Sequence, residues 1–531
     1  MFYDWQVGAI KAIQGASAIL SAPTGSGKTL VAYVWAGLMD MDGKPVMPSH
    51  RVIFTAPIKA LSNERYLDLK SMGFDVGLET GDFKKNAGAL VLCCTQEIYT
   101  LKYAHIPHQK VIVDEFHYIF NDPERARAYI DGLRMTSFDS DILVMSATFG
   151  SPENVRNYLE ETTMREFAFF ETQSRVTDLV FKKSGIRFNR IHDALVFVFS
   201  KRGAEWLAMQ ISRTRRKIDR ERRARLREIA DILEVKSLPE TTLRGVAMYF
   251  GSLLPKEKLL VEMAFRERIL DVVVGTDALS LGVNLPAQTV VFGQMAKFID
   301  GPLTKNEFMQ MAGRAGRKGY FNPGYVTYVP RSKCEHHDYD TGLLYLETLD
   351  KSCEEARIRL LPAVGRLLKK EVTIEVEAKM LAEFSLPRRG YAEAMAEVEE
   401  LLRQISAMLG GIKDQKKRKT ARKILADIWS DEMDVAPNIA VARLFAEKES
   451  PPALEAADIL RRTERNYLQA LLKIKRFSNR LPEGYSFSHM EQIDLAVNRI
   501  DTSVFGFEEK ISMIKATESV VEDDEAEEEK L

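Results

Sequence analysis

The sequence predicts an α/β protein with two tandem parallel-sheet domains, followed by a mostly α-helical C-terminal region. Up to about residue 330, short apolar runs alternate with helix-like stretches, a pattern typical of open α/β sheets. The alternation is interrupted once, over about residues 166–183, where we expect the linker between the two domains. After about residue 331, the apolar residues follow a helical period instead.

The expected strands are short and almost continuously apolar, as parallel strands are when helices cover both faces of a sheet. They span residues 18–20, 52–55, 89–93, 111–113, 142–145, 194–199, 246–249, 272–274 and 289–292. Together with the linker, they predict a first domain over residues 1–168, a second over 169–330, a helical region over 331–515 and a disordered acidic tail over 516–531.

The helical region contains an apolar stripe with alternating steps of four and three residues, which predicts one long helix packed into a bundle. Its members are Tyr391, Met395, Val398, Leu402, Ile405 and Leu409, and the pair Gly410 and Gly411 marks its expected end. We expect a second helical stretch over about residues 453–477.

The net charge of the 531-residue chain is −1, which alone would argue against a nucleic-acid-binding protein. This average hides two unlike parts. Residues 516–531 contain eight acids and one base and so carry −7, which leaves +6 on residues 1–515. The body is therefore mildly basic, and the tail could dock a protein partner, cover basic surfaces or aid solubility.

Cysteine usage and the apolar runs exclude further classes of protein. Four cysteines are too few for a disulfide scaffold and fit a reducing compartment, so we expect a cytoplasmic protein, with a nuclear one as the alternative. No run of about 18 apolar residues predicts a transmembrane helix, and the N-terminus lacks the basic region of a signal peptide.

A phosphate-binding loop follows the first expected strand. After Ser21 it reads Ala22, Pro23, Thr24, Gly25, Ser26, Gly27, Lys28 and Thr29, and a helix-like run follows. The glycines let backbone N–H groups approach phosphate oxygens, Lys28 places a charge on the β- and γ-phosphates, and the Thr29 hydroxyl can hold magnesium. The loop therefore predicts an ATP site with magnesium, although Ala22 stands where the general pattern has glycine.

Two adjacent carboxylates end the apolar strand at 111–113, where they are costly unless they meet a cation. We expect Asp114 to hold magnesium and Glu115 to position and activate the water that attacks the γ-phosphate. His117 could sense the γ-phosphate and pass its state onward. Ser146 and Thr148, with Ala147 between them, follow another strand and form a weaker signal.

Residues 310–317 combine two arginines with paired small residues, and we expect them at the start of a helix. Arg314 and Arg317 are three residues apart and would project from one helical face. A guanidinium aimed at a transferred phosphate is an arginine finger. The two arginines therefore predict that ATP lies between the two domains.

The ordered set of these motifs resembles the superfamily 2 helicases of the DExH type. Further stretches resemble the superkiller-like group, which includes the RNA-exosome helicases and an archaeal DNA-repair helicase. These stretches are residues 56–63, 77–82, 251–255, 276–287 and 297–301. The resemblance covers about residues 1–330 and implies two RecA-like domains, ATP and magnesium as cofactors, and single-stranded nucleic acid as the partner.

The resemblance also implies roles for individual residues. Gln6 would read adenine, Gly282 would reach ATP, and Gln310, Arg314 and Arg317 would join Asp114 and Glu115 in catalysis, with His117, Ser146 and Thr148 in coupling. The contacts to the nucleic-acid backbone would be Pro57, Lys59, Ser62, Thr80, Gly81 and Thr95 in the first domain and Ser200, Arg202, Thr276 and Asn284 in the second. Small hydroxyls, lysines and loop N–H groups bind phosphates without reading sequence.

Two departures from the group stand out. Tyr249 and Phe250 replace the paired histidines that the group usually has, and we expect both aromatic residues in the core, with stacking on a base as the alternative. The helical region matches no part of the group, which leaves open whether the group's winged-helix and ratchet-helix domains are shortened, replaced or absent.

Three clusters lie outside the motifs. Residues 213–227 hold nine bases and two acids and predict an inserted or extended helix that contacts nucleic acid or an acidic partner, with a solvated face as the alternative. Residues 413–423 predict a loop that enters a helix and a candidate RNA contact. Cys334, His336, His337 and Cys353 could bind zinc, but their spacing matches no common ligand pattern. Cys93 and Cys94 are expected in the core.

The motifs thus predict a monomeric, ATP-dependent helicase or translocase. The resemblance to the superkiller-like group implies that it moves 3′ to 5′ and acts on RNA. One alternative is a DNA helicase in repair or in defence against foreign DNA. The other is an ATPase adaptor that positions a partner nuclease through its helical C-terminal region.

Overall fold

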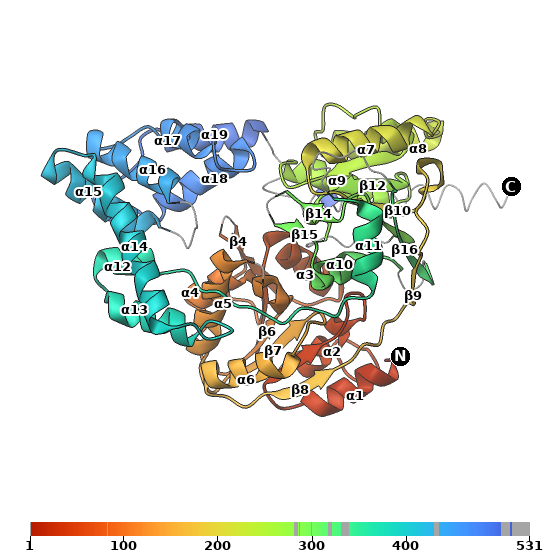
Figure 1. The fold of residues 1–531 in the computed structure, drawn as a ribbon, viewed down its shortest axis with the longest axis horizontal. Helices are drawn as coiled ribbons and strands as arrows, with labels where there is room; N and C mark the ends of the chain where they lie inside the picture. The colour runs from red at the N-terminus through yellow and green to blue at the C-terminus, as the bar shows by residue number, and fades with distance from the viewer. Residues whose placement is uncertain are drawn as a thin grey trace. The chain divides into compact units, whose positions relative to one another are not determined.

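The computed structural model describes residues 2–81, 83–120, 122–280, 285, 287–298, 300–316, 321–330, 339–429, 435–500, 510, 511 and 514. The chain forms two compact units, each made of two separate segments. Figure 1 labels the helices and strands in chain order. The first unit combines Met1–Arg175 with Ser352–Ile493, and the second combines Val176–Lys351 with Asp494–Leu531. The acidic tail predicted at 516–531 lies outside the described residues.

The first unit contains, within the described ranges, an eight-stranded sheet in the order β4-β3-β5-β2-β6-β7-β1-β8. Neighbouring strands are parallel except for β3 and β4. The strands are β1 (Ala18–Ser21), β2 (Arg51–Ala56), β3 (Val76–Glu79), β4 (Lys84–Lys85), β5 (Val91–Thr95), β6 (Gln109–Val113), β7 (Asp141–Ser146) and β8 (Ala168–Glu171). All five strands expected in this domain are present; β3, β4 and β8 were not expected.

Helices cover both faces of this sheet, because alternate strand residues point to opposite sides. Ile19 and Ile53 pack with α4 (Gln96–Lys102), α5 (Pro123–Met135) and α6 (Pro152–Thr163) on one face. Leu20 and Phe54 pack with α1 (Asp4–Ile13), α2 (Lys28–Trp35) and α3 (Lys59–Ser71) on the other. The sheet is therefore a buried middle layer, as the continuous apolar runs predicted.

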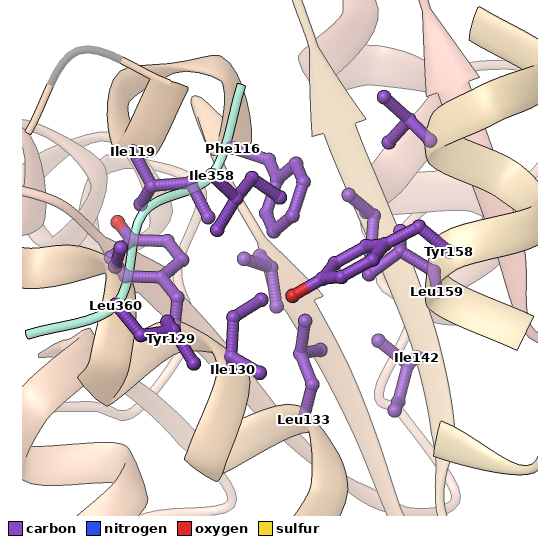
Figure 2. Close-up of a cluster of buried hydrophobic side chains, with 14 of the residues drawn as sticks. Phe116, Ile119, Tyr129, Ile130, Leu133, Ile142, Tyr158, Leu159, Ile358 and Leu360 are labelled. Atoms are coloured by element: carbon purple, nitrogen blue, oxygen red, sulfur yellow. The ribbon is translucent and has the colours of Figure 1, made fainter. Parts of the chain in front are cut away.

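The C-terminal segment of the first unit completes one of these two cores. Ile358 and Leu360 lie over Phe116 and Tyr129 of the first segment (Figure 2). Helices α12 (Val364–Lys369), α13 (Ile374–Glu383) and α14 (Tyr391–Gly410) add further buried side chains to the same cluster. The hydrophobic core is thus built from residues more than 200 positions apart in the chain.

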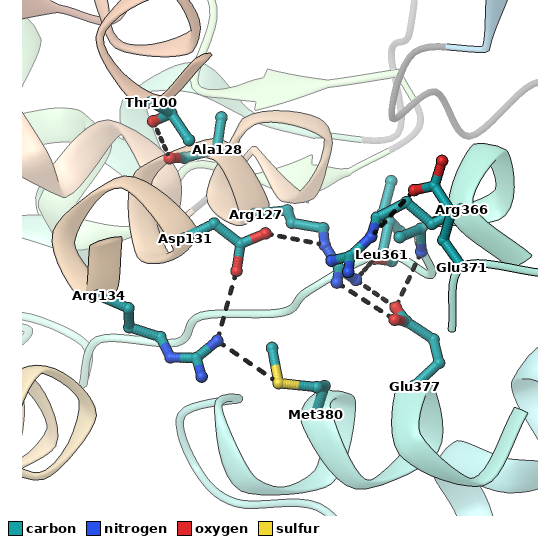
Figure 3. A network of polar contacts seen from close by, with 11 residues as sticks. Thr100, Arg127, Ala128, Asp131, Arg134, Leu361, Arg366, Glu371, Glu377 and Met380 are labelled. Carbon is teal, nitrogen blue, oxygen red and sulfur yellow. Dashed lines mark hydrogen bonds and ion pairs between the residues drawn. The ribbon is translucent and has the colours of Figure 1, made fainter. Parts of the chain in front are cut away.

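A buried ion pair joins the same two segments (Figure 3). Arg127 of α5 and Glu377 of α13 are 3% and 0% exposed, and Arg127 Nη2 lies 3.2 Å from Glu377 Oε2. Arg127 Nη1 also donates to the carbonyl of Leu361 at 3.0 Å, and the Ala363 N–H donates to Glu377 Oε1 at 2.9 Å. Both charges are therefore desolvated but fully engaged in hydrogen bonds.

The remaining helices are α15 (Gln415–Ile428), α16 (Ala436–Glu447), α17 (Ala453–Leu460), α18 (Tyr467–Ser478) and α19 (Met490–Ile500). Helix α14 ends at Gly410, as predicted. The single stretch expected over 453–477 is wrong, because it is divided into α17 and α18. Asn466 interrupts it, since its side chain accepts a hydrogen bond from the Gln469 N–H and caps the second helix.

The second unit contains a six-stranded parallel sheet, within its described part, in the order β11-β12-β10-β13-β16-β9. These strands are β9 (Leu179–Phe181), β10 (Ala194–Phe197), β11 (Val246–Tyr249), β12 (Val272–Gly275), β13 (Thr289–Phe292) and β16 (Gly324–Tyr328); β14 (Ala296–Lys297) and β15 (Gly301–Pro302) form a separate ribbon. Helix α7 (Lys201–Arg213) packs on one face, and α8 (Arg220–Ile232), α9 (Pro255–Arg266), α10 (Lys305–Ala312) and α11 (Thr341–Leu349) pack on the other.

These two sheets and the helices that follow them confirm the predicted fold class. Across the described ranges, the structure has no helix that is both long enough and apolar enough to cross a bilayer.

Candidate nucleotide and nucleic-acid sites

The carboxyl edge of the first sheet carries two neighbouring groups of predicted residues. The phosphate loop follows β1, the acid pair follows β6 and the 146–148 stretch follows β7, and these three strands are adjacent. The residues predicted to bind nucleic acid follow β2, β5 and β3, which are adjacent in the other half of the sheet. Because parallel strands end at the same edge, the fold places a candidate nucleotide site beside a candidate strand-binding surface.

The phosphate loop has the backbone that close approach to phosphate requires. Gly25 and Gly27 have φ angles of 77° and 88°, and Gly27 is the N-cap of α2. Lys28 Nζ donates to the carbonyls of Ala22 at 3.1 Å and Ser146 at 3.0 Å. The Thr24 and Ser26 hydroxyls are buried without a hydrogen-bond partner among the described residues, as expected of groups that bind a ligand.

Gln6 lies against this loop from α1. Its side chain is 1% exposed, its Nε2 donates to the Gly27 carbonyl at 3.1 Å, and its Oε1 accepts from the Tyr3 N–H at 2.9 Å. These contacts fix the side chain against the phosphate loop.

The acid pair has a constrained backbone. Glu115 has a φ of 52°, in the left-handed region that non-glycine residues seldom adopt, and such strain is common at functional sites. The Glu115 N–H donates to Asp114 Oδ1 at 2.9 Å. Burial and the charge of Glu115 raise the pKa of Asp114, while the cations Arg65 and Lys28 act in the opposite direction.

His117 connects the acid pair to the next strand. Its Nδ1 lies 3.4 Å from Glu115 Oε2 and accepts a hydrogen bond from the Ala147 N–H at 3.0 Å. Ala147 stands between Ser146 and Thr148. The hydrogen bond therefore joins His117 to the stretch that holds Ser146 and Thr148, the other two residues predicted to couple hydrolysis to movement.

Arg65 of α3 is a residue that the sequence analysis missed. Its Nη2 lies 3.3 Å from Thr29 Oγ1 and 3.4 Å from Asp114 Oδ2. These are the two residues predicted to hold magnesium. Arg65 belongs to no recognisable motif, and only the fold brings it to this position.

In the half of the sheet edge that is the candidate nucleic-acid surface, several cations lie around Lys59. Arg125 donates to the carbonyl of Pro57 and to Glu97 Oε1, the latter at 2.8 Å. Burial first, and then the charges of Arg476 and Arg125, lower the pKa of Lys59 to about 7. Arg476 of α18 also lies at Gly81, where an added Cβ would be 3.6 Å from its Cδ. Arg125 and Arg476 are further residues that sequence analysis missed.

The other predicted residues of this half are mostly buried, Ser62 in α3 and Thr80 and Thr95 at the ends of β3 and β5. Ser62, Thr80 and Thr95 are 1%, 7% and 5% exposed. The Thr80 N–H donates to the Phe83 carbonyl at 2.8 Å, which closes the turn after β3. Gly81 in that turn is exposed, so its backbone is accessible at this edge of the sheet.

The pKa of Lys59 gives a pH dependence that can be measured. Phosphate favours the charged amine, so binding should take up a proton, and affinity for a single strand should rise as pH falls from about 8.5 to about 6. Above pH 7 the expected loss is up to about tenfold per pH unit. Titration by fluorescence anisotropy checks this. Lys59→Arg should flatten the profile, whereas the exposed Lys11→Arg should not; an unchanged slope in Lys59→Arg would contradict the assignment.

In the second unit, two predicted contacts lie at the carboxyl ends of adjacent strands, β10 and β12. Ser200 caps α7, and its Oγ accepts from the Gly203 N–H at 2.9 Å. Thr276 accepts from the Ala278 N–H at 3.4 Å, and Arg202 is exposed. Gly282 and Asn284 lie outside the described residues.

The expected helix start at 310–317 is wrong. Gln310 lies in the last turn of α10, which ends at Ala312, and Arg314 follows the helix. Gly316 has a φ of 77°, and Ala315 pairs with Ala287, so this backbone leaves the helical conformation. Arg314 donates to the Ser280 carbonyl, and Arg317 lies outside the described residues. Arg314 therefore does not project from a helix.

Comparison with known proteins identifies the family. Residues 3–156 match the DEAD/DEAH box helicase family, and residues 152–319 match the helicase conserved C-terminal domain. The chain belongs to the superfamily 2 helicases. The first match includes β1 to β7 of the first sheet, and the second includes β9 to β13 of the second sheet.

Relatives place this helicase in the superkiller-like group, as the motifs predicted. It is 28% identical over 417 residues to the DExH-box ATP-dependent RNA helicase DExH9 of Arabidopsis thaliana. This match covers 62% of this chain and 41% of that protein. It is 29% identical over 401 residues to the ATP-dependent RNA helicase mtr4 of Schizosaccharomyces pombe, covering 58% and 35%. The helicase thus spans about two fifths or less of these relatives.

A solved structure supports the fold alone. The crystal structure of the DUF1998 helicase MrfA bound to DNA has a TM-score of 0.50 and 19% identity to this helicase. The match covers 67% of this chain and 50% of that one.

In the two basic runs of the helicase, some bases form ion pairs within the fold and others are exposed. Within 213–227, Arg215 pairs with Asp271, and Arg225 pairs with Glu267 at 2.7 Å. The expected helix over this run begins only at α8, where Asp219 accepts from the Arg222 N–H. The exposed bases of the run are Arg213, Arg216, Lys217, Arg220, Arg222 and Arg227. In the second run, Asp414 caps α15, and Lys416, Lys417, Arg418, Lys419, Arg422 and Lys423 are exposed.

The candidate zinc residues Cys334, His336 and His337 lie outside the described residues. In the part that the structure describes, no group of three or more His, Cys, Asp or Glu side chains could hold a metal ion.

Cys93 and Cys94 are buried in β5, and Tyr249 and Phe250 are 4% and 7% exposed. All four residues lie in the core, as expected.

Proposed function

We propose that the protein is an ATP-dependent helicase or translocase that acts on single-stranded RNA. One observation carries the proposal: the carboxyl edge of one sheet holds a phosphate loop and acid pair directly beside a row of residues suited to a nucleic-acid backbone. The relatives described as RNA helicases favour RNA over DNA.

The donors at the nucleotide site suit magnesium. Thr29 Oγ1 and Asp114 Oδ2 both lie within 3.4 Å of one guanidinium nitrogen of Arg65, so they flank a position that a cation fills. Hydroxyl and carboxylate oxygens are the donors that Mg²⁺ prefers. We propose that Thr29 and Asp114 would hold the ion, which when bound would neutralise charge on the β- and γ-phosphates.

In the proposed cycle, Lys28 moves from its carbonyl partners to the phosphates, and Glu115 accepts a proton from the attacking water. The hydrogen bond from Ala147 to His117 then carries the state of the acid pair to the 146–148 stretch. For Gln6, Gly282, Gln310, Arg314 and Arg317, the proposed roles in ATP binding and hydrolysis rest on the family motifs. Alternating grips of the two RecA-like domains would move the strand 3′ to 5′.

The substrate preference is tested by ATP turnover in the presence of RNA or DNA single strands of matched length and sequence. We expect RNA to stimulate turnover more than DNA does. Stimulation by DNA alone would refute the RNA proposal and favour a DNA helicase. Lys28→Met is the control, because it lacks the phosphate-binding cation, and it should show no turnover with either polymer. Duplexes with a 3′ or a 5′ single-stranded tail test the direction.

A further inference from the structure

Arg65 lies at the candidate metal position but has no role in the proposed cycle. We propose that its guanidinium competes with a divalent cation for the oxygen donors of Thr29 and Asp114. The Arg65 side chain would then have to leave these two oxygens before the metal binds. The identity of that cation as the magnesium of ATP rests on the proposed function. The competition itself rests on the geometry alone.

One nitrogen of Arg65 contacts both oxygen donors. Nη2 is 3.3 Å from the Thr29 hydroxyl and 3.4 Å from the Asp114 carboxylate, and the Arg65 and Asp114 side chains are only 18% and 11% exposed. At these distances and this exposure, the ion pair is poorly screened by water. A metal ion held by the same two oxygens could not share the position with a guanidinium.

The other nitrogen of the guanidinium is held separately. Nη1 donates to the Tyr33 hydroxyl at 3.0 Å and lies 3.3 Å from Asp68 Oδ2, and the Tyr33 hydroxyl also bonds to Asp68. The guanidinium lies 5.8 Å and 5.7 Å from the ring centroids of Tyr33 and Phe54, within cation–π range. Arg65 can therefore move away from Thr29 and Asp114 while its ion pair with Asp68 stays in place.

Lys28 does not duplicate this role. Its ammonium group lies on the carbonyls of Ala22 and Ser146, whereas the ion pair to Asp114 comes from Arg65. Arg65 also belongs to α3, whose first residue is Lys59. Displacement of Arg65 by a metal would therefore act on the helix that begins at the strand-binding surface.

The test measures divalent cations directly, without nucleotide. Binding of Mn²⁺ is followed by the paramagnetic resonance signal of the free ion, for the full-length parent and for Arg65→Gln. We expect Arg65→Gln to bind Mn²⁺ at least about tenfold more tightly, because the competing charge is gone. Arg65→Lys, which keeps a charge but cannot span both sets of partners, should fall between the two.

Arg156→Gln is the matched control, because Arg156 lies in the same unit and pairs only with Glu160 in the ion pairs described. It should bind Mn²⁺ like the parent. Adding Asp114→Asn to Arg65→Gln should abolish the gain, which shows that the new site uses Asp114. Equal Mn²⁺ affinity in Arg65→Gln and the parent, with both folded by circular dichroism, would overturn the proposal. A parent that failed to bind ATP would refute the proposed function and leave this comparison valid.

Discussion

Glu115→Gln is expected to bind ATP like the parent and to lower ATP turnover by about 10²–10⁴-fold, the usual contribution of a general base. The amide preserves the shape of the side chain but cannot accept a proton from water. The left-handed backbone at Glu115 and the neighbouring His117 constrain the position of the carboxylate. Steady-state turnover and binding of a fluorescent ATP analogue separate the two effects.

Glu153→Gln is the matched control for this variant. Glu153 is an exposed carboxylate in the first turn of α6 in the same unit, and its replacement should leave turnover unchanged. Turnover in Glu115→Gln within about threefold of the parent would mean that another group accepts the proton. Loss of ATP binding would instead indicate that the substitution disturbs the site itself.

Arg127→Met is expected to destabilise the first unit by about 3–5 kcal/mol, because it leaves Glu377 as an unpaired charge in the core. Arg127 is 3% exposed and donates to Glu377, Leu361 and Asp131, so its replacement by methionine removes all three of these hydrogen bonds. Urea unfolding gives the free energy. Hydrogen exchange should show increased opening of α13 in particular.

Two variants give the controls. Arg388→Met removes an ion pair between the same two segments, Arg388 with Glu161, but both side chains are more than 60% exposed, so the expected loss is about 0–1 kcal/mol. The double variant Arg127→Met with Glu377→Leu should recover most of the stability, since no lone charge remains. Equal losses in Arg127→Met and Arg388→Met would show that the buried pair contributes no more than a surface one.

The sheets were predictable because a strand that is covered on both faces must be apolar along its length. The strands at β1, β2, β6, β7, β11 and β13 follow this rule, whereas β8, β9 and β16 did not stand out. Strands β8 and β9 lie at sheet edges, where burial is only partial. The place of the C-terminal helices was not predictable, since α13 meets α5 through contacts that no local pattern records.

The candidate site was predictable where chemistry requires consecutive residues. The phosphate loop and the acid pair are compact motifs, and their spacing alone reveals them. Arg65, Arg125 and Arg476 are single cations on helices, indistinguishable in sequence from solvated surface residues. The misjudged start of a helix at 310–317 has a similar cause, since small residues suit both a helix and the turn that ends it.

The order of segments in the first unit has a consequence for synthesis on the ribosome. Residues 1–175 form the sheet, but the segment that completes their core begins only at Ser352. At about 5–20 residues per second, that segment emerges roughly 10–40 s later. During this interval the apolar surface around Phe116 and Tyr129 lacks its cover, and Arg127 lacks Glu377. The nascent first sheet should therefore be a target for chaperones, whereas all six strands of the second sheet lie within residues 179–328 and can pair as soon as they emerge.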